Sequence, residues 1–310
     1  MSLLGIRDRV HVRAPGKLNV FFEVGDVQDD GYHDVASVYQ AVSAYEDVIA
    51  TPADDFRVTV TGAVDVGDVP LDDRNLAVRA ARLIARELEQ PGGVHLELRK
   101  GVPVAGGMGG GSADAAAALV ACDALWDGGL SSARLHELAA RLGADVPFSL
   151  LGGTAVGTGR GDELAPALAR GRFDWVLVTN AEGLSTPTVY GELDRLRAQP
   201  DITPRRGTPA VDPAVLQSLR AGDPIALAAA VRNDLQVAAC HLRPGLSALI
   251  ETGIAYGGLA GIVSGSGPTV AFLAGSDAAA RDLRADLIAV GHDVLHVHGP
   301  VPGAKVVSFT

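Results

Sequence analysis

The sequence predicts an α+β fold in two domains. Segments that alternate as strands do, such as FRVTVTG at 56–62, are mixed with helical segments, and hairpin-like connections join them rather than repeated βα units. A length of 310 residues with 47% hydrophobic residues is enough for one large core or two ordinary ones. A glycine-punctuated stretch precedes a new buried strand, WVLVTN, so we place the boundary near residue 170, between domains 1–170 and 171–310.

The first half begins with strands. VHVRAPGKLNVFFEV at 10–24 has β-branched and aromatic residues on both sides of a Pro-Gly step, which predicts two strands or one bent strand, and VASVYQAVSAYEDVIA at 35–50 continues the pattern. From residue 73 the apolar positions follow a helical period until PGG at 91–93. A strand over 94–104 then leads into a glycine loop, and helices are predicted over 112–126 and 131–143.

The second half mixes both element types. WVLVTN at 175–180 predicts a buried strand, and the segments from 212 to 253 are mostly helical. A helix is predicted over 276–291, and strands over 293–299 and 304–310. The segment RAQPDITPRRGTPAVDP at 197–213 predicts an exposed loop.

Charge and cysteine content exclude several classes of function. The net charge of −11, without a run of lysine or arginine, argues against nucleic-acid or membrane-surface binding. Cys122 and Cys240 form no CxxC pair, so neither a disulfide framework nor a zinc site is expected. The first residues lack the apolar core of a signal peptide, and no later stretch is apolar enough to span a bilayer. These features favour the cytoplasm.

The most informative segment is the loop between strand and helix, where five of the six residues from Gly106 to Gly111 are glycine. Such a loop can turn several backbone N–H groups toward one anion, and the helix that follows adds its own free N–H groups. Ser112 is predicted to cap the helix or to contact a phosphate or a metal ion. The alternative is a tight turn that solves a packing problem. Neither the P-loop pattern nor G-x-G-x-x-G fits.

Three segments taken together resemble the motifs of the GHMP kinase superfamily. They are APGKLN at 14–19, PVAGGMGGGSADAAAAL at 103–119 and GIVSGSGPTVAF at 261–272. The resemblance implies a GHMP kinase fold with an N-terminal domain like ribosomal protein S5 and a ferredoxin-like C-terminal domain. The active site is then expected in the cleft between the two domains.

Further segments resemble one branch of this superfamily, whose members phosphorylate the 2-hydroxyl of 4-diphosphocytidyl-2-C-methyl-D-erythritol with ATP in non-mevalonate isoprenoid biosynthesis. The segments are DDGYH at 29–33, GADVPF at 143–148 and STPTVY at 185–190. The implied partner is a small molecule with a cytidine diphosphate group, bound by a monomer or weak homodimer. The alternatives are another GHMP kinase, of the homoserine or mevalonate type, or a non-catalytic ligand sensor.

The resemblance also implies roles for individual residues. Asp145 would accept the substrate proton, with Lys17 beside it, although from the residues alone Lys17 fits a surface lysine and Asp145 a turn or cap. The ATP site would comprise Pro103, Val104, Ala105, Gly106, Gly107, Met108, Gly109, Gly110, Gly111 and Ser112, with Asn75 and Lys100 as weaker candidates near adenine. Substrate would contact Asn19, Tyr32, His33, Thr186 and Tyr190. Mg²⁺ is expected with ATP; no metal ligand is certain, and Ser112 is one candidate. For Asp114, a structural or metal-linked role is expected.

Overall fold

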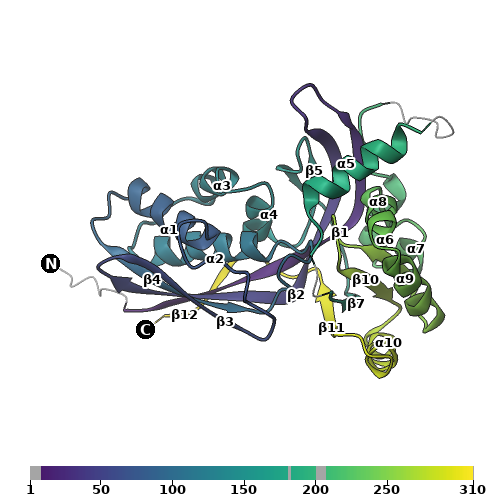
Figure 1. Ribbon diagram of the computed structural model, residues 1–310. Coiled ribbons are helices and arrows are strands. Elements are labelled where there is room, and N and C mark those ends of the chain that lie inside the picture. Colours follow the sequence, from purple (N-terminus) through teal and green to yellow (C-terminus); the bar gives the residue numbers. More distant parts are fainter. Residues whose placement is uncertain (1–7, 181–182, 200–206, 310) are drawn as a thin grey trace.

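The structure is a computed structural model that describes residues 8–180, 183–199 and 207–309. Figure 1 shows two lobes side by side, and each has its own sheet. The strands of the first sheet are β1 Val10–Val27, β2 His33–Ala53, β3 Phe56–Gly62, β4 Gly93–Lys100, β5 Thr154–Thr158, β6 Glu163–Pro166, β8 Arg232–Asn233 and β12 Lys305–Phe309. Its main path runs in the order β12-β1-β2-β4-β3.

Helices cover one face of this sheet (Figure 1). They are α1 Leu76–Glu87, α2 Gly110–Leu125, α3 Ser132–Ala140 and α4 Val146–Leu151. The central helix α2 contacts β1, β2, α1 and α4. Its run from Ala115 to Ala118 is fully buried, because side chains this small let the helix lie close to its neighbours on several sides. The alanine-rich sequence thus suits a helix that is surrounded by the core.

The second sheet has four strands, β7 Phe173–Val178, β9 Ala260–Val263, β10 Val270–Ala274 and β11 Val294–Gly299. Their order is β11-β7-β10-β9 and each neighbouring pair is antiparallel. Numbered along the chain, this order is fourth-first-third-second, with a helix inside each crossover as in a ferredoxin-like unit. The helices of this lobe are α5 Thr186–Arg197, α6 Pro213–Ala221, α7 Pro224–Ala228, α8 Leu235–Leu242, α9 Gly245–Ala255 and α10 Asp277–Ala289.

The two lobes are connected by more than one pass of the chain. The segment predicted as two strands or one bent strand is a single strand, β1, whose pairing with β2 shifts register after Pro15 and again after Asn19. β8 pairs parallel to β1, and the last strand, β12, returns to the first sheet beside β1. The division at residue 170 stays a prediction.

The predicted exposed loop over 197–213 falls partly on residues 200–206, which lie outside the described residues. Among the residues that the structure describes, no helix has both the length and the apolar character needed to cross a membrane.

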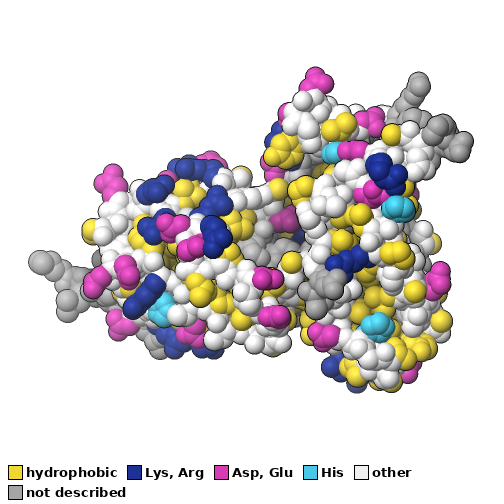
Figure 2. All heavy atoms as spheres, in the orientation of Figure 1, with side chains coloured by type: hydrophobic (Ala, Val, Ile, Leu, Met, Phe, Trp, Pro, Cys, Tyr) yellow, Lys and Arg dark blue, Asp and Glu magenta, His cyan; other side chains and the backbone are white. Residues whose placement is uncertain are grey.

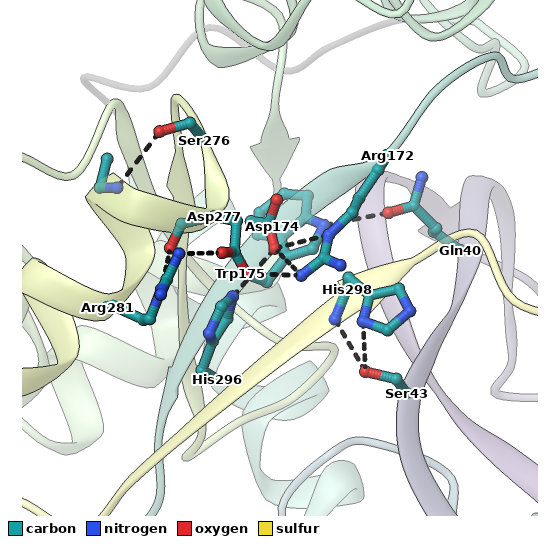
Figure 3. Close-up of polar contacts among 11 residues, drawn as sticks. Gln40, Ser43, Arg172, Asp174, Trp175, Ser276, Asp277, Arg281, His296 and His298 are labelled. Carbon is teal, nitrogen blue, oxygen red and sulfur yellow. Dashed lines mark hydrogen bonds and ion pairs between the residues drawn. The ribbon is translucent and has the colours of Figure 1, made fainter.

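Polar contacts join the second sheet to β2 (Figure 3). The indole N–H of Trp175 on β7 donates to Oε1 of Gln40 at 2.9 Å, and both residues are buried. On β11 the backbone N–H of His298 donates to Oγ of Ser43, also at 2.9 Å. Because a buried indole N–H without a partner is costly, the Trp175–Gln40 bond stabilises the contact between the two lobes.

Beside these contacts an ionic cluster surrounds the buried carboxylate of Asp174. Arg172 Nη2 donates to Asp174 at 2.6 Å and to Asp277 at 2.9 Å, while His296 Nε2 lies 2.9 Å from the same Asp174 oxygen (Figure 3). The Arg172 guanidinium therefore supplies the positive charge between the two carboxylates. Burial alone would raise the pKa of Asp174, but the hydrogen bonds from Arg172 and His296 outweigh it and hold that pKa below its usual value.

The Asp174→Asn variant is expected to lower the free energy of unfolding at pH 7 by about 1–3 kcal/mol, because a neutral amide replaces the charged acceptor of Arg172. The pKa of Asp174 is lower in the folded state than in the unfolded chain. Its stabilising contribution is therefore complete above the unfolded pKa, about 3.9, and is lost as the pH falls through the folded value. Urea unfolding should show the gap between wild type and variant narrowing below about pH 4. A gap that stays constant with pH would contradict this assignment.

Candidate active site

Lys17 is a buried residue of β1, and it lies directly after the register shift at Pro15 and Gly16. Its backbone N–H donates to the carbonyl of Met108 in the glycine loop at 2.9 Å. Its ammonium donates to Oδ1 of Asn19 at 2.7 Å, and Asn19 in turn donates to Oγ of Ser37 at 2.8 Å. The alternative of a solvated surface lysine is therefore wrong, because backbone and side-chain bonds both fix Lys17.

Asp145 comes to this lysine from the start of α4. Its Oδ2 lies 3.6 Å from Nζ of Lys17, and its side chain is 30% exposed. Asp145 holds the N-cap position of α4, as the cap alternative expected, but its carboxylate makes no capping hydrogen bond and faces Lys17 instead. Its role as proton acceptor stays a prediction. Burial and the charge of Asp145 raise the pKa of Tyr39, whose ring lies under Lys17, and of Tyr190.

The glycine loop leads directly into α2. Gly107 and Gly109 have φ of 75° and 71°, which favours glycine. The helix begins at Gly110, and its first internal bond runs from Ala113 N–H to the Gly109 carbonyl. The N–H groups before Ala113 therefore lie at the open end of the helix. Ser112 was expected as the N-cap, and this is wrong: the left-handed Gly109 takes that position, so Ser112 falls in the first helical turn.

The third motif packs against this loop. Ser264 Oγ donates to the Gly107 carbonyl at 3.2 Å, and a Cβ on Gly107 would lie 2.2 Å from the Ser264 carbonyl oxygen. Asn233 stabilises the third motif, because its side-chain amide donates to the carbonyls of Val263 and Gly265 at 2.8 and 2.7 Å. Part of the glycine content thus solves a packing problem between the two motifs.

These elements enclose a cavity of about 210 Å³ in the hollow between the two lobes (Figure 2). It is lined by Lys17, Asn19, Phe22, Tyr39, Gly107, Gly109, Asp145, Arg160, Thr186, Tyr190, Leu235, Gly265 and Ser266. Five candidate side chains from distant segments therefore meet at one place, and Thr186 Oγ1 is 2.9 Å from Ser266 Oγ. Figure 2 shows basic and acidic side chains interspersed on this face.

Two candidate substrate residues lie outside the lining of this cavity. His33 is buried, with Nε2 2.9 Å from Oδ1 of Asp194, and its ring packs against Tyr190 with the centroids 5.0 Å apart. Tyr32 is 57% exposed, and the guanidinium of Arg160 lies 4.0 Å from its ring centroid. Both residues nevertheless contact the lining of the cavity: His33 packs against Tyr190, and Tyr32 packs against Arg160.

A second cavity, of about 260 Å³, lies on the other side of the glycine loop. Its wall includes Pro103, Val104, Ala105, Asn75, Lys100, Gly110 and Gly111. Gly107 and Gly109 face the first cavity while Gly110 and Gly111 face the second, so the loop separates the two. Among the remaining loop residues, Met108 is buried in the core, and a Cβ on Gly106 would lie 2.6 Å from Thr269 Oγ1.

Asn75 and Lys100, the candidates near adenine, both make structural contacts. Asn75 caps α1 by accepting from the Ala77 N–H and donates to the Pro70 carbonyl. The buried Lys100 ammonium contacts Asp114 and lies 2.6 Å from Glu46. Asp114 therefore makes a structural contact, which is one of its two expected roles; the metal-linked role stays a prediction.

Lys100, Glu46 and Asp114 form a buried triad in which two acids share one base. Burial and the neighbouring Asp114 raise the pKa of Glu46 to about 8, against the opposing effect of Lys100. Burial likewise raises the pKa of Asp114. For Lys100, burial would lower the pKa, but the two carboxylates outweigh it and raise it. The positive charge of Lys100 is thus balanced by Glu46 and Asp114, whose raised pKa values disfavour two full negative charges in this buried site.

Comparison with known proteins identifies the family. The model of the GHMP kinases N terminal domain matches residues 75–153, and the model of the GHMP kinases C terminal matches residues 215–293. A Leifsonia xyli protein named 4-diphosphocytidyl-2-C-methyl-D-erythritol kinase is 59% identical over 304 residues, which are 97% of this chain and 99% of the relative. The chain belongs to the GHMP kinase family. The predicted GHMP kinase fold is confirmed.

Other relatives and solved structures support the same family and fold. A Mycolicibacterium smegmatis protein with the same name is 51% identical to this GHMP kinase over 96% of this chain and 92% of the relative. A crystal structure of 4-(cytidine 5'-diphospho)-2C-methyl-D-erythritol kinase has a TM-score of 0.75 at 31% identity, over 93% of this chain and 98% of that one. A mevalonate kinase from L. major also reaches 0.75 over 96% and 98% of the two chains, but at 15% identity it shows the fold alone.

Sequence reasoning missed several residues of the candidate site in this GHMP kinase. Tyr39 and Ser37 lie in an ordinary strand pattern, and Asn233 lies in an unremarked VRNDL segment. Arg160 stands between two glycines, in GTGRGDEL, and that spacing is a turn signal which could have marked it as a loop-tip arginine. Ser266 was inside a motif that was recognised, but no role was assigned to it.

Proposed function

We propose that this GHMP kinase transfers the γ-phosphoryl group of ATP to the 2-hydroxyl of 4-diphosphocytidyl-2-C-methyl-D-erythritol, giving the 2-phosphate and ADP in the non-mevalonate route to isoprenoid precursors. The observation that carries the chemistry is the pair of Lys17 and Asp145, 3.6 Å apart beside the glycine loop. The choice of substrate rests on relatives that bear this name and match nearly the whole chain.

The position of the loop supports a nucleotide that lies across it. A base in the second cavity and a triphosphate along Gly107 to Gly111 would bring the terminal phosphate beside Lys17 in the first cavity. The open N–H groups at the start of α2 then stabilise phosphate charge, and a local site of this kind lets an acidic protein bind a polyanion. Asn75 and Lys100 would act on adenine mainly by shaping the cavity, because their polar atoms are bonded within the protein.

In the acceptor site the two charged residues have separate tasks. Asp145 accepts the proton of the attacking hydroxyl, and its carboxylate is free to do so because the helix it begins does not use it. Lys17 holds that carboxylate in place and offsets the charge on the equatorial oxygens of the transferred group. Asn19 orients Lys17 through its 2.7 Å hydrogen bond. Placement of the reactants and stabilisation of charge account for most of the rate enhancement in phosphoryl transfer.

Tyr32, His33, Thr186 and Tyr190 are proposed to bind the cytidine end. Tyr190 lines the cavity and packs on His33, so a base placed against Tyr190 has the imidazole nearby. Stacking supplies affinity, and hydrogen bonds to the polar edge of the base supply specificity. The guanidinium of Arg160 now covers one face of the Tyr32 ring, so a base can stack on that face only after the guanidinium moves.

Mg²⁺ is proposed to accompany ATP. Glu46 and Asp114, the carboxylates near the start of α2, both pair with Lys100. We propose the half-buried hydroxyl of Ser112 in the first turn as one ligand, and Asp114 as a second candidate, because Asp114 lines the second cavity and its Oδ1 has no hydrogen-bond partner among the described residues. One hydroxyl fits an ion that is held mainly by phosphates and water. When bound, the ion neutralises charge on the phosphate oxygens.

Comparison of acceptors tests this function against the alternatives. ADP release should be fast with the cytidyl substrate and at background level with homoserine or mevalonate. Turnover of one of those two instead would replace the proposed substrate with that of another GHMP kinase. Binding of nucleotide without ADP release from any acceptor would indicate a ligand sensor.

A further inference from the structure

Two hairpin tips meet at the edge of the first cavity. Arg160 stands at the tip between β5 and β6, and Tyr32 belongs to the connection between β1 and β2. The Arg160 guanidinium lies 4.0 Å from the centroid of the Tyr32 ring and is also bonded to the carboxylate of Asp30. Arg160 lines the cavity, whereas Tyr32 does not. The arginine therefore covers one face of an aromatic ring while it borders the cavity.

The backbone that carries Arg160 is held firmly. The carbonyl of Gly159 accepts from the Val35 N–H at 2.8 Å, and the Gly161 N–H donates to the Thr158 carbonyl at 2.9 Å. A Cβ on Gly161 would lie 2.5 Å from the hydroxyl oxygen of Tyr39, so this turn sits directly against the residue that underlies Lys17. Only the side chain of Arg160 is free to change partners.

Charge balance shows what this side chain is available to bind. Among the described residues that line the cavity, the positive charges are those of Lys17 and Arg160. Lys17 contacts Asn19 and Asp145 and its side chain is only 8% exposed, whereas the Arg160 side chain is 53% exposed. An exposed ion pair such as Arg160–Asp30 contributes little and is easily exchanged. A planar guanidinium can donate to two phosphate oxygens at once. A phosphate group can therefore replace the Asp30 carboxylate as the partner of Arg160.

We propose that Arg160 binds the diphosphate of the substrate and, in leaving the Tyr32 ring, uncovers it for the base. This inference rests on the proposed function, since it takes the acceptor to be a nucleoside diphosphate derivative. One side chain would thereby couple recognition of the diphosphate to recognition of the base. Arg160 would be a specificity-determining residue that contacts substrate, distinct from the groups that move the proton and the phosphoryl.

The test compares two ligands that differ only in their phosphates. Affinities of cytidine and CDP are measured by calorimetry for wild type and for Arg160→Met, which keeps an unbranched apolar stem but lacks the guanidinium. CDP binding is expected to weaken about tenfold to a hundredfold in the variant, since a charge-assisted bidentate contact is lost. Cytidine binding should be unchanged or slightly tighter, because the Tyr32 ring is no longer covered. Arg160→Lys should fall between the two for CDP.

A matched control uses Arg281, an exposed arginine of α10 that also pairs with a single aspartate and does not line the cavity. Arg281→Met should leave both affinities unchanged. Equal losses for cytidine and CDP in Arg160→Met would overturn the proposal, because they would indicate a disturbed hairpin. Unchanged CDP affinity would overturn it as well. If wild type binds neither ligand, the proposed function itself fails, an outcome that is distinct from a failure confined to the variant.

Discussion

The Asp145→Asn variant is expected to transfer phosphate at least about a hundredfold more slowly than wild type, with ATP affinity nearly retained. An amide cannot take the proton of the attacking hydroxyl, and it no longer balances the charge of Lys17, which lies 3.6 Å away. Most of the nucleotide is expected in the second cavity and along the glycine loop, and only its terminal phosphate reaches the first cavity, so its binding depends little on this carboxylate. Steady-state kinetics with the cytidyl substrate, together with nucleotide titration, measure both quantities.

Stability separates this effect from misfolding. The Asp145 carboxylate makes no capping bond and is partly exposed, so the thermal midpoint of Asp145→Asn should stay close to that of wild type. Ser149→Ala is a matched control on the same helix, because its hydroxyl donates only to the Asp145 backbone carbonyl. Its turnover should be nearly normal. Wild-type turnover in Asp145→Asn would remove this carboxylate from the mechanism.

Gly107→Ala is expected to lower the free energy of unfolding by about 2 kcal/mol or more and to raise the KM for ATP by at least about tenfold. Gly107 has a φ of 75°, and an added Cβ would lie 2.2 Å from the Ser264 carbonyl oxygen. Because that contact is with backbone, no rotation of a side chain relieves it, and the loop must separate from the third motif. Chemical unfolding and ATP kinetics give the two values.

Gly111→Ala provides the comparison within the same loop. Gly111 lies in the first turn of α2, and a Cβ there would be 3.7 Å from Leu76, an ordinary contact. Its free energy of unfolding should be within about 0.5 kcal/mol of wild type. Equal stability of the two variants would contradict the packing role assigned to Gly107.

Much of the fold could be predicted because local pattern and tertiary environment agree. The helix α1 follows from apolar spacing, and Ile84 on its predicted face is fully buried. The alternation in FRVTVTG gives β3. The glycine loop before α2 and the Gly265–Gly267 turn could be placed between elements because glycine permits backbone conformations that other residues avoid. The Pro-Gly step of the first motif is no turn; it lies within β1, where the pairing with β2 shifts register. The family resemblance then linked segments that no local pattern connects.

Contacts between distant segments could not be read from the sequence. Nothing local shows that Lys17 is buried, that Tyr39 lies below it, or that Asn233 holds the third motif from a separate strand. The N-cap of α2 was misplaced because Ser112 is a common capping residue, whereas Gly109 takes that position through its backbone conformation. Arg160 and Tyr32 are 128 residues apart and meet only through the pairing of β2 with β5.

The most direct test of the central claim is a structure of the protein with a non-hydrolysable ATP analogue and 4-diphosphocytidyl-2-C-methyl-D-erythritol bound together. The account predicts the triphosphate along Gly107 to Gly111, the 2-hydroxyl of the acceptor within hydrogen-bonding distance of Asp145, and Lys17 beside the terminal phosphate. An acceptor whose 2-hydroxyl lies away from Asp145, with another hydroxyl in line with the phosphate, would contradict it.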